Sequence, residues 1–138
     1  MNEHATLNAN AISGTGNFTN AYGSVTIIGN QTSTGATAIA NGVVSLTRAG
    51  KLGATSAVAI AGGGSLILGQ TNAGNSAAAN VPRLNNLNIP LTLGGLSSNL
   101  AGGGRFQIEN SNVTSVVQNI GNVTINPGFS TVLALSLI

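Results

Sequence analysis

Six short apolar runs, each next to glycine or asparagine, recur along this chain and limit what it can fold into. They are residues 24–29, 43–47, 65–69, 90–94, 105–109 and 122–127. Between their midpoints the steps are 19, 22, 23, 15 and 19 residues. A short recurring step is typical of repeat architectures, in which each unit is too small to bury its own apolar face and neighbouring units stack. The sequence therefore predicts a β-solenoid, whose role is shape and surface more than chemistry.

Within the runs, large apolar residues alternate with small or polar ones. The alternating sets are Val25/Ile27, Leu66/Leu68, Leu91/Leu93, Phe106/Ile108, Val123/Ile125 and Leu133/Leu135/Leu137, and the residues expected to point outward are Thr26, Thr92, Gln107, Thr124 and Ala134. A period of two is the pattern of a half-buried strand. The many glycines and β-branched residues disfavour long helices. We therefore expect an all-β chain.

Turn-forming residues separate the runs, and further strands are expected between them. Glycine triplets precede two runs, and glycine reaches the left-handed backbone angles that tight corners need. The weaker strands are expected at residues 37–39, 56–61, 84–89 and 113–117, which gives two to three strands per coil. Residues 1–138 form one solenoid domain in this interpretation, with a frayed N-terminus at 1–10 and a protruding loop at 70–80.

An antiparallel β-sandwich is the structural alternative. Asn41-Gly42 lies between apolar runs, and this dipeptide is a common hairpin signal. Sandwich strands, however, usually follow one another every 8 to 12 residues without a longer repeat. The spacing of the six runs therefore favours the solenoid.

Charge is nearly absent from the chain. Only 4% of the residues are charged, against about 25% in ordinary domains. The basic residues are Arg48, Lys51, Arg83 and Arg105. Four scattered cations make no phosphate-binding patch, so we expect no nucleic-acid partner. A surface with little charge also lacks the repulsion that keeps proteins apart, which suits a chain that assembles.

The sequence offers no set of residues for catalysis or metal binding. His4 is the one histidine, Glu3 and Glu109 are the two acids, and aspartate and cysteine do not occur. A Ser-His-Asp triad, a carboxylate pair and a calcium-binding β-roll all need acids that are missing. We therefore expect no enzyme activity, no catalytic, cofactor-binding or metal site, and no cofactor.

The end of the chain, residues 131–138, is an apolar strand pattern without charge or proline. Natural solenoids usually cover their terminal coil, because an open edge recruits other chains. Three interpretations remain open: the chain continues into further coils, this end pairs with the next subunit of a fibre, or the strand packs only against its own neighbour. No segment has the length of a membrane helix, so we expect no membrane insertion.

Residues 11–69 resemble the autotransporter-associated β-strand repeat. The matching segments are Ile12-Ser-Gly-Thr-Gly16, Tyr22-Gly-Ser-Val-Thr-Ile-Ile-Gly-Asn30, Asn41-Gly-Val-Val-Ser-Leu46, Leu52-Gly-Ala-Thr-Ser-Ala-Val-Ala-Ile60 and Gly64-Ser-Leu-Ile-Leu-Gly69. The family's "NTYTG" is replaced by Gln31-Thr-Ser-Thr-Gly35, and the aspartate of its "LDLG" strand is Ile67. The resemblance implies a right-handed parallel β-helix that is secreted or displayed on a bacterial cell surface.

Together these patterns predict an extracellular structural protein, the subunit of a surface fibre or stalk that assembles end to end with itself by strand pairing. The alternative is an adhesin-type module within a longer passenger, which binds a glycan or a surface receptor. For glycan binding the available aromatic residues are Phe18, Tyr22, Phe106 and Phe129. We expect the three phenylalanines to be buried, which disfavours the adhesin.

Overall fold

The computed structural model describes residues 6–69, 82–84, 88–95, 102–110 and 118–136. Every regular element in this part of the chain is a β-strand, and every strand pair in it is parallel. The predicted parallel β-helix is therefore confirmed. The antiparallel β-sandwich is wrong, because no described pair of strands has antiparallel register.

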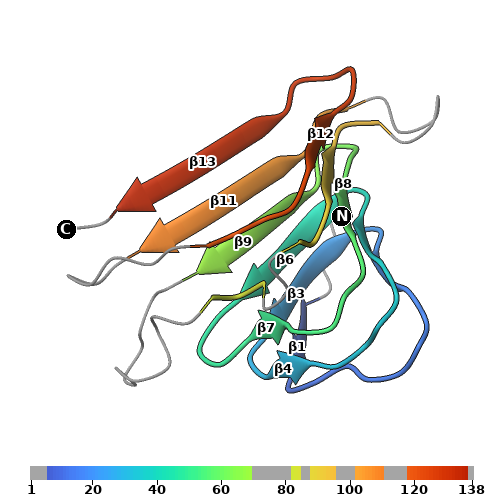
Figure 1. The fold of residues 1–138 in the computed structure, drawn as a ribbon, viewed down its shortest axis with the longest axis vertical. Helices are drawn as coiled ribbons and strands as arrows, with labels where there is room; N and C mark the ends of the chain where they lie inside the picture. Colours follow the sequence, from blue (N-terminus) through green and yellow to red (C-terminus); the bar gives the residue numbers. More distant parts are fainter. Residues whose placement is uncertain (1–5, 70–81, 85–87, 96–101, 111–117, 137–138) are drawn as a thin grey trace.

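Sheet A is the largest sheet, and its six strands lie one above another (Figure 1). In spatial order they are β1 (Thr6–Ala9), β3 (Gly23–Ile27), β6 (Gly42–Leu46), β9 (Ser65–Gly69), β11 (Arg105–Asn110) and β13 (Thr131–Ser136). The spatial order follows the order in the chain, as expected when each strand belongs to the next coil of one winding.

Two further sheets complete the coils. Sheet B contains β2 (Phe18–Asn20), β5 (Thr37–Ile39), β8 (Val58–Ile60), β10 (Leu91–Leu93) and β12 (Val123–Ile125). Sheet C pairs β4 (Asn30–Gln31) with β7 (Lys51–Leu52), and Leu84 continues this ladder as a single bridge to Leu52. A complete coil thus runs through sheet B, then sheet A, then sheet C.

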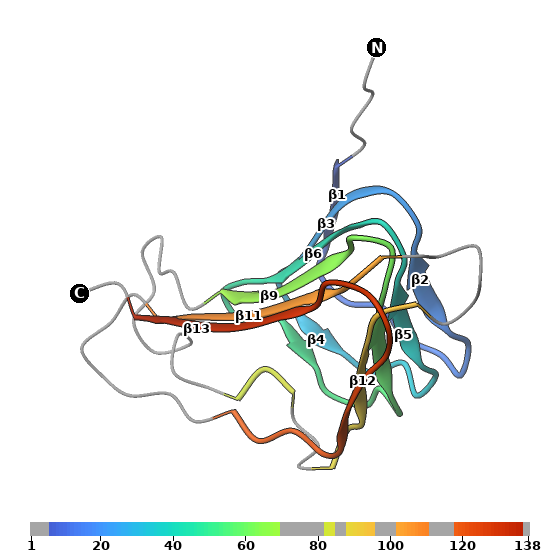
Figure 2. The ribbon, with the colours of Figure 1, turned by 90° about the horizontal axis from the view of Figure 1, so that it is seen from above.

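The winding is right-handed. In Figure 2 the chain runs leftward along β3, continues through β4 below it, and rises through β5 in sheet B before β6 begins. This path is counterclockwise for a viewer toward whom the chain advances, since β11 and β13 lie above β9 in Figure 1. Right-handed crossovers are also the strong preference for parallel strands.

The core is a set of apolar columns that run along the stack. In sheet A, Val25, Val44, Leu66 and Phe106 lie in one column, and all four are buried. The column beside it contains Ile27, Leu46, Leu68 and Ile108. Sheet B contributes the columns through Val58/Leu91 and Ile60/Leu93. One continuous core therefore extends through the coils, and each apolar side chain in it packs against its equivalents above and below.

All six predicted runs contain strands, but the runs belong to two different sheets. Residues 24–29, 43–47 and 65–69 do provide successive strands of sheet A. Residues 90–94 and 122–127 contain β10 and β12, which belong to sheet B. The register partners Leu66 and Phe106 are 40 positions apart, and Phe106 and Val132 are 26 apart. Because the later coils contain more residues than the first ones, runs from sheet B fall at the spacing expected for sheet A and seem to continue the same series.

The weaker strands and the chain ends have mixed outcomes. The strands expected at 37–39 and 56–61 are confirmed as β5 and β8. In the segment 84–89 only the single bridge of Leu84 is seen among the described residues. Residues 6–9, expected to be frayed, form β1 in register with β3. Residues 1–5, the expected loop at 70–80 and the expected strand at 113–117 lie outside the described part of the chain.

Candidate functional site

The last described coil leaves the apolar columns of both large sheets open. Val123 and Ile125 lie directly above Leu91 and Leu93 in sheet B, and Ile125 is 63% exposed although Leu93 is fully buried. In sheet A, Val132 lies above Phe106 and is 57% exposed. These side chains occupy core positions and lack only a further coil above them. The upper end of the described stack is therefore an uncovered cross-section of the core.

The first coil leaves a similar end on the opposite side. Leu7 continues the column of Val25 and is more than half exposed. No described strand lies below β1 in sheet A or below β2 in sheet B. Both ends of the described stack therefore carry open strand edges, and the strands at both ends run in the same direction. Such edges present unpaired backbone N–H and C=O groups to any chain that can pair with them.

The side chains of β13 lie on the opposite faces of sheet A from those that the sequence pattern predicts. Register places Leu133 beside Gln107 and Leu135 beside Glu109, in the outward columns, whereas Val132 and Ala134 continue the inward ones. Ala134 was expected to point outward, so that prediction is wrong. A shift of one residue exchanges the two faces of a strand, and in an apolar segment the alternation alone does not tell them apart. As a result, Leu133 and Leu135 lie on the outer face of sheet A.

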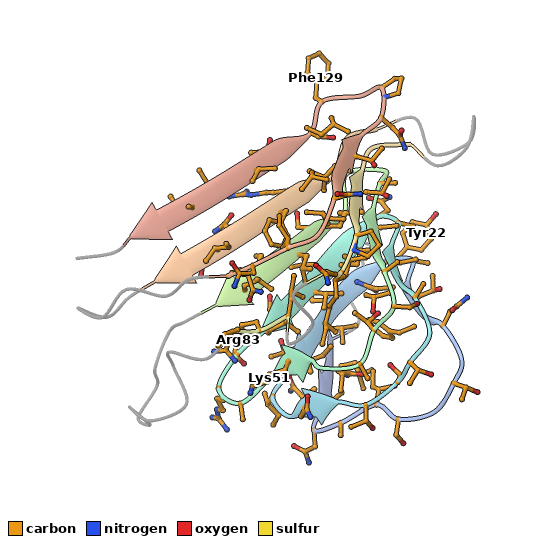
Figure 3. The ribbon with its side chains drawn as sticks, viewed as in Figure 1. Tyr22, Lys51, Arg83 and Phe129 are labelled. Carbon is orange, nitrogen blue, oxygen red and sulfur yellow. The ribbon has the colours of Figure 1, made fainter. Side chains whose placement is uncertain are left out.

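Arg83 is the most deeply buried charged side chain among the described residues, with no exposed surface. Its Nη1 donates to the carbonyl oxygens of Arg48 (2.5 Å) and Gly50 (2.8 Å), and its Nη2 donates to that of Gly69 (2.8 Å). Figure 3 labels Arg83 near the carboxyl end of β9, where Gly69 lies. Burial lowers the pKa of Arg83 from its usual value.

The contacts of Arg83 join two successive coils. Arg48 and Gly50 belong to the turn after β6, Gly69 ends β9, and Arg83 itself precedes the bridge of Leu84 to Leu52. The turn contains strain, because Arg48 has a φ of 53°, which non-glycine residues rarely adopt. A guanidinium with several donors in one plane suits such a cluster of carbonyl groups. Arg83 therefore links neighbouring coils through hydrogen bonds inside the stack.

The side chain of Gln118 closes the upper end of sheet C. Its Oε1 accepts hydrogen bonds from the backbone N–H groups of Arg83 (2.7 Å) and Leu84 (3.1 Å). Its Nε2 donates to the carbonyl oxygen of Leu84 at 3.1 Å and to that of Asn119 at 2.8 Å. An amide group thus takes the place of the next strand. Sheet C is capped by a side chain at this end, whereas sheets A and B are open.

Exposed aromatic residues mark the corner between sheets B and A. Phe129 precedes β13 and is fully exposed (101%), so the expectation that all three phenylalanines are buried is wrong for it. Phe106 is buried, and Phe18 is partly buried against the core. Tyr22, between β2 and β3, is 77% exposed. Figure 3 shows Phe129 and Tyr22 well apart, in the last and an early coil.

The residues considered for catalysis are not brought together in the described structure. Glu3 and His4 lie outside the described residues, and Glu109 accepts a hydrogen bond from Gln107 Nε2 within β11. In the part of the chain that is described, no three His, Cys, Asp or Glu side chains gather as a metal site would require. The same residues include no helix long and apolar enough to cross a membrane.

The sequence analysis did not predict the structural roles of Arg83 and Gln118. It counted Arg83 as one of four scattered cations and did not single out Gln118. Their partners are backbone groups, which carry no signal in the sequence. Comparison of the chain with family models, with curated proteins and with solved structures finds no match. The resemblance of residues 11–69 to the autotransporter-associated repeat therefore stays a prediction. The open ends of sheets A and B are the candidate functional site.

Proposed function

We propose that this chain is a structural β-solenoid, the subunit of a fibre or stalk that is built by adding coils end to end through strand pairing. The observation that carries the proposal is the exposure of core positions at the last coil. Val123, Ile125 and Val132 lie in columns that are buried one coil below. Covering such apolar side chains with a further coil stabilises the assembly by roughly 25 cal/mol per Å² of apolar surface removed from water.

The described edge strands β1 and β13 suit this role, because neither carries the usual protection against edge pairing. Natural edge strands often carry charged residues, proline or a bulge that prevents pairing. The terminal strands of sheet A, β1 and β13, contain no charged residue and no proline. In this proposal the chain is not an enzyme, and its mechanism is backbone pairing between coils together with the continuous apolar core.

An extracellular or bacterial cell-surface location belongs to the same proposal. It is supported by the resemblance of residues 11–69 to a repeat that is found in secreted and surface-displayed proteins. Antibody labelling of intact producing cells tests it. Signal at the surface of unpermeabilised cells is the expected result, and signal that appears only after permeabilisation would contradict the location.

Electron microscopy of the purified chain in vitreous ice tests the assembly itself. The expected result is filaments whose diffraction contains a meridional spacing of about 4.8 Å, the distance between paired strands along the stack. Sedimentation should show a matching large species that depends on protein concentration. Dispersed particles, each the length of a single chain at all concentrations, would contradict the proposal.

A second candidate function is an adhesin-type binding module, and the exposure of Tyr22 and Phe129 favours it. Exposed aromatic rings bind the apolar faces of sugars. These two rings are separated by about four strand spacings, roughly 19 Å, so one sugar unit cannot contact both. Glycan-array binding that is lost in both Tyr22→Ala and Phe129→Ala variants would support this function. Binding that is unchanged in both variants would remove it.

A further inference from the structure

The two open edges of sheet A match each other in backbone polarity. Thr131 N–H donates downward to Gly104 O at 2.9 Å. Backbone groups in a parallel strand point alternately to its two sides, so Val132 and Ala134 direct theirs toward the open upper edge. At the other end, Ala9 O accepts from Ile28 N–H at 3.0 Å. Asn8 consequently directs its backbone groups toward the open lower edge of β1.

From this match we infer that β13 of one copy pairs in parallel with β1 of a second copy of this chain, with Leu133 beside Asn8. This inference rests on the proposed function and specifies its joint. In this register the N–H and C=O of Asn8 in the second copy face the backbone groups of Val132 and Ala134. A parallel ladder requires this arrangement, in which one residue bonds to the two residues that flank its partner.

The side chains agree with the same register. Val132 then lies beside Leu7 of the second copy, and Ala134 beside its Ala9, so that both inward columns continue across the joint. A slip by one residue would place Leu133 below Leu7 and exchange the faces of the strand. Apolar core positions on one copy would then meet outward positions on the other. Side-chain phase and backbone polarity both exclude a slip by one residue. Among the registers that remain, straight continuation of the column through Leu7, Val25 and Phe106 to Val132 selects Leu133 beside Asn8.

The joint is a head-to-tail contact, because it brings the C-terminal edge of one copy to the N-terminal edge of the next. Contacts of this heterologous kind do not close on themselves in a straight stack, and they produce open filaments. Sheet A has six described strands and sheet B five. In the joint, β12 and β2 of the second copy therefore lie about two strand spacings apart, roughly 9.6 Å. The paired strands of the joint thus cover Val132 and place no strand directly over Val123 and Ile125. Sheet A is thus the part of the joint whose register is defined.

Disulfide trapping tests the register directly, since the chain has no cysteine of its own. Asn8 and Leu133 are the expected outward partners across the joint, and neighbouring parallel strands place their Cα atoms within the range that a disulfide spans. The double variant Asn8→Cys/Leu133→Cys is oxidised under assembly conditions. We expect a reducible ladder of dimers, trimers and longer oligomers on a denaturing gel.

Three controls make the ladder specific. Each single variant can form only dimers, because one cysteine per chain cannot extend a series. The pair Asn8→Cys/Val132→Cys points to opposite faces of the sheet and should give no ladder. The pair Thr26→Cys/Leu133→Cys reports a different joint, in which β1 is displaced and β13 pairs with β3. Asn8 is exposed and Leu133 lies on an edge strand, so these changes leave the core columns intact.

The outcomes separate the register from the assembly. A ladder with Asn8→Cys/Leu133→Cys alone supports the inference. Filaments that are trapped only by Thr26→Cys/Leu133→Cys, or by neither pair, overturn the register and leave the proposed function standing. Absence of filaments in electron micrographs together with absence of any ladder overturns both.

Discussion

Val132 lies directly above Phe106 in the parallel register of sheet A, yet Phe106 is 1% exposed and Val132 is 57% exposed. The two residues hold equivalent positions in one column, and only Phe106 has a described coil above it. A charge at Val132 should therefore block the next coil and leave the existing ones in place.

The variant Val132→Asp tests this relationship. We expect filaments to disappear from electron micrographs, because a carboxylate at this position would be buried without a partner in any joint. The free energy of unfolding of the dispersed chain should change by less than about 1 kcal/mol, since Val132 is already exposed. Thr131→Asp, on the outward face of the same strand, is the matched control and should retain filaments. Filaments of normal length with Val132→Asp would contradict the proposed assembly.

Removing the Arg83 guanidinium should destabilise the stack. Arg83→Met relieves the cost of burying a charge, but it leaves the carbonyl groups of Arg48, Gly50 and Gly69 without their donor. Each unsatisfied buried carbonyl costs about 1–3 kcal/mol, so we expect a net loss of about 2–4 kcal/mol in urea unfolding. Arg105→Met, at an exposed position, should change the unfolding free energy by less than about 0.5 kcal/mol. Equal stability of the two variants would show that the contacts of Arg83 contribute nothing.

The pH dependence of Arg83 has a definite sign. Burial lowers the pKa of Arg83, so the folded chain holds this proton less tightly than the unfolded chain does. Stability linked to Arg83 therefore rises with pH, and only in the strongly alkaline range where arginine begins to lose its proton. The difference in unfolding free energy between the protein and Arg83→Met should be constant from about pH 6 to about pH 9. A difference that varies across this range would show that another group titrates with Arg83.

Gln31 should be replaceable with a gain in stability. Its side chain is 1% exposed, and neither Nε2 nor Oε1 has a hydrogen-bond partner. It lies beside Leu52 in the sheet C ladder, so Gln31→Leu continues an apolar column and removes an unsatisfied amide. We expect a gain of about 1–3 kcal/mol in the free energy of unfolding.

Thr55 provides the opposite case for comparison. Its buried hydroxyl contacts Thr37 Oγ1 at 3.0 Å and donates to Gly35 O at 2.9 Å. Thr55→Val should cost about 1 kcal/mol or more, because those groups lose their partner. If Gln31→Leu proves as destabilising as Thr55→Val, the amide of Gln31 is satisfied in solution and the expectation fails.

The corner below Phe129 should not accept a side chain at Gly103. A Cβ built on Gly103 would lie 1.4 Å from the carbonyl oxygen of Phe129. Gly103→Ala should therefore push the last coil away and cost about 3 kcal/mol or more in chemical unfolding. Gly16 has no atom within 4 Å of such a Cβ, so Gly16→Ala should be nearly neutral. Comparable unfolding curves for the two variants would show that this corner is not closely packed.

The parallel solenoid could be predicted from the sequence because the alternation of apolar and polar residues matches the buried and outward faces of the strands. Val25/Ile27 and Leu66/Leu68 alternate with polar neighbours, and the buried side of each strand follows from that pattern. The first coils are also similar in length, since the successive partners Leu7, Val25, Val44 and Leu66 are 18, 19 and 22 positions apart. A regular step and a clear alternation therefore gave the fold class and the first strands of sheet A.

The remaining features depend on contacts that leave no mark in the sequence. Nothing in the sequence around Arg83 shows that three backbone carbonyl groups, two from the coil below and one from its own coil, converge on its guanidinium. The side of β13 that faces the core is fixed by pairing with Phe106, because Val132 to Leu135 are apolar on both faces. The uncharged segment 131–138 raised an open C-terminal edge as one of three interpretations. The open edge of β1 was not predicted, because residues 1–10 were expected to be frayed.

The coils of sheet A enclose very different numbers of residues, 19 between Val25 and Val44 but 40 between Leu66 and Phe106. Their strands are nevertheless immediate neighbours in the same ladder. Axial length is consequently counted in rungs of about 4.8 Å and does not depend on how much chain each rung carries. In a protein built in this way, residues can be inserted between two strands without changing the length of the stack. The length of the protein and the loops on its surface can therefore change separately.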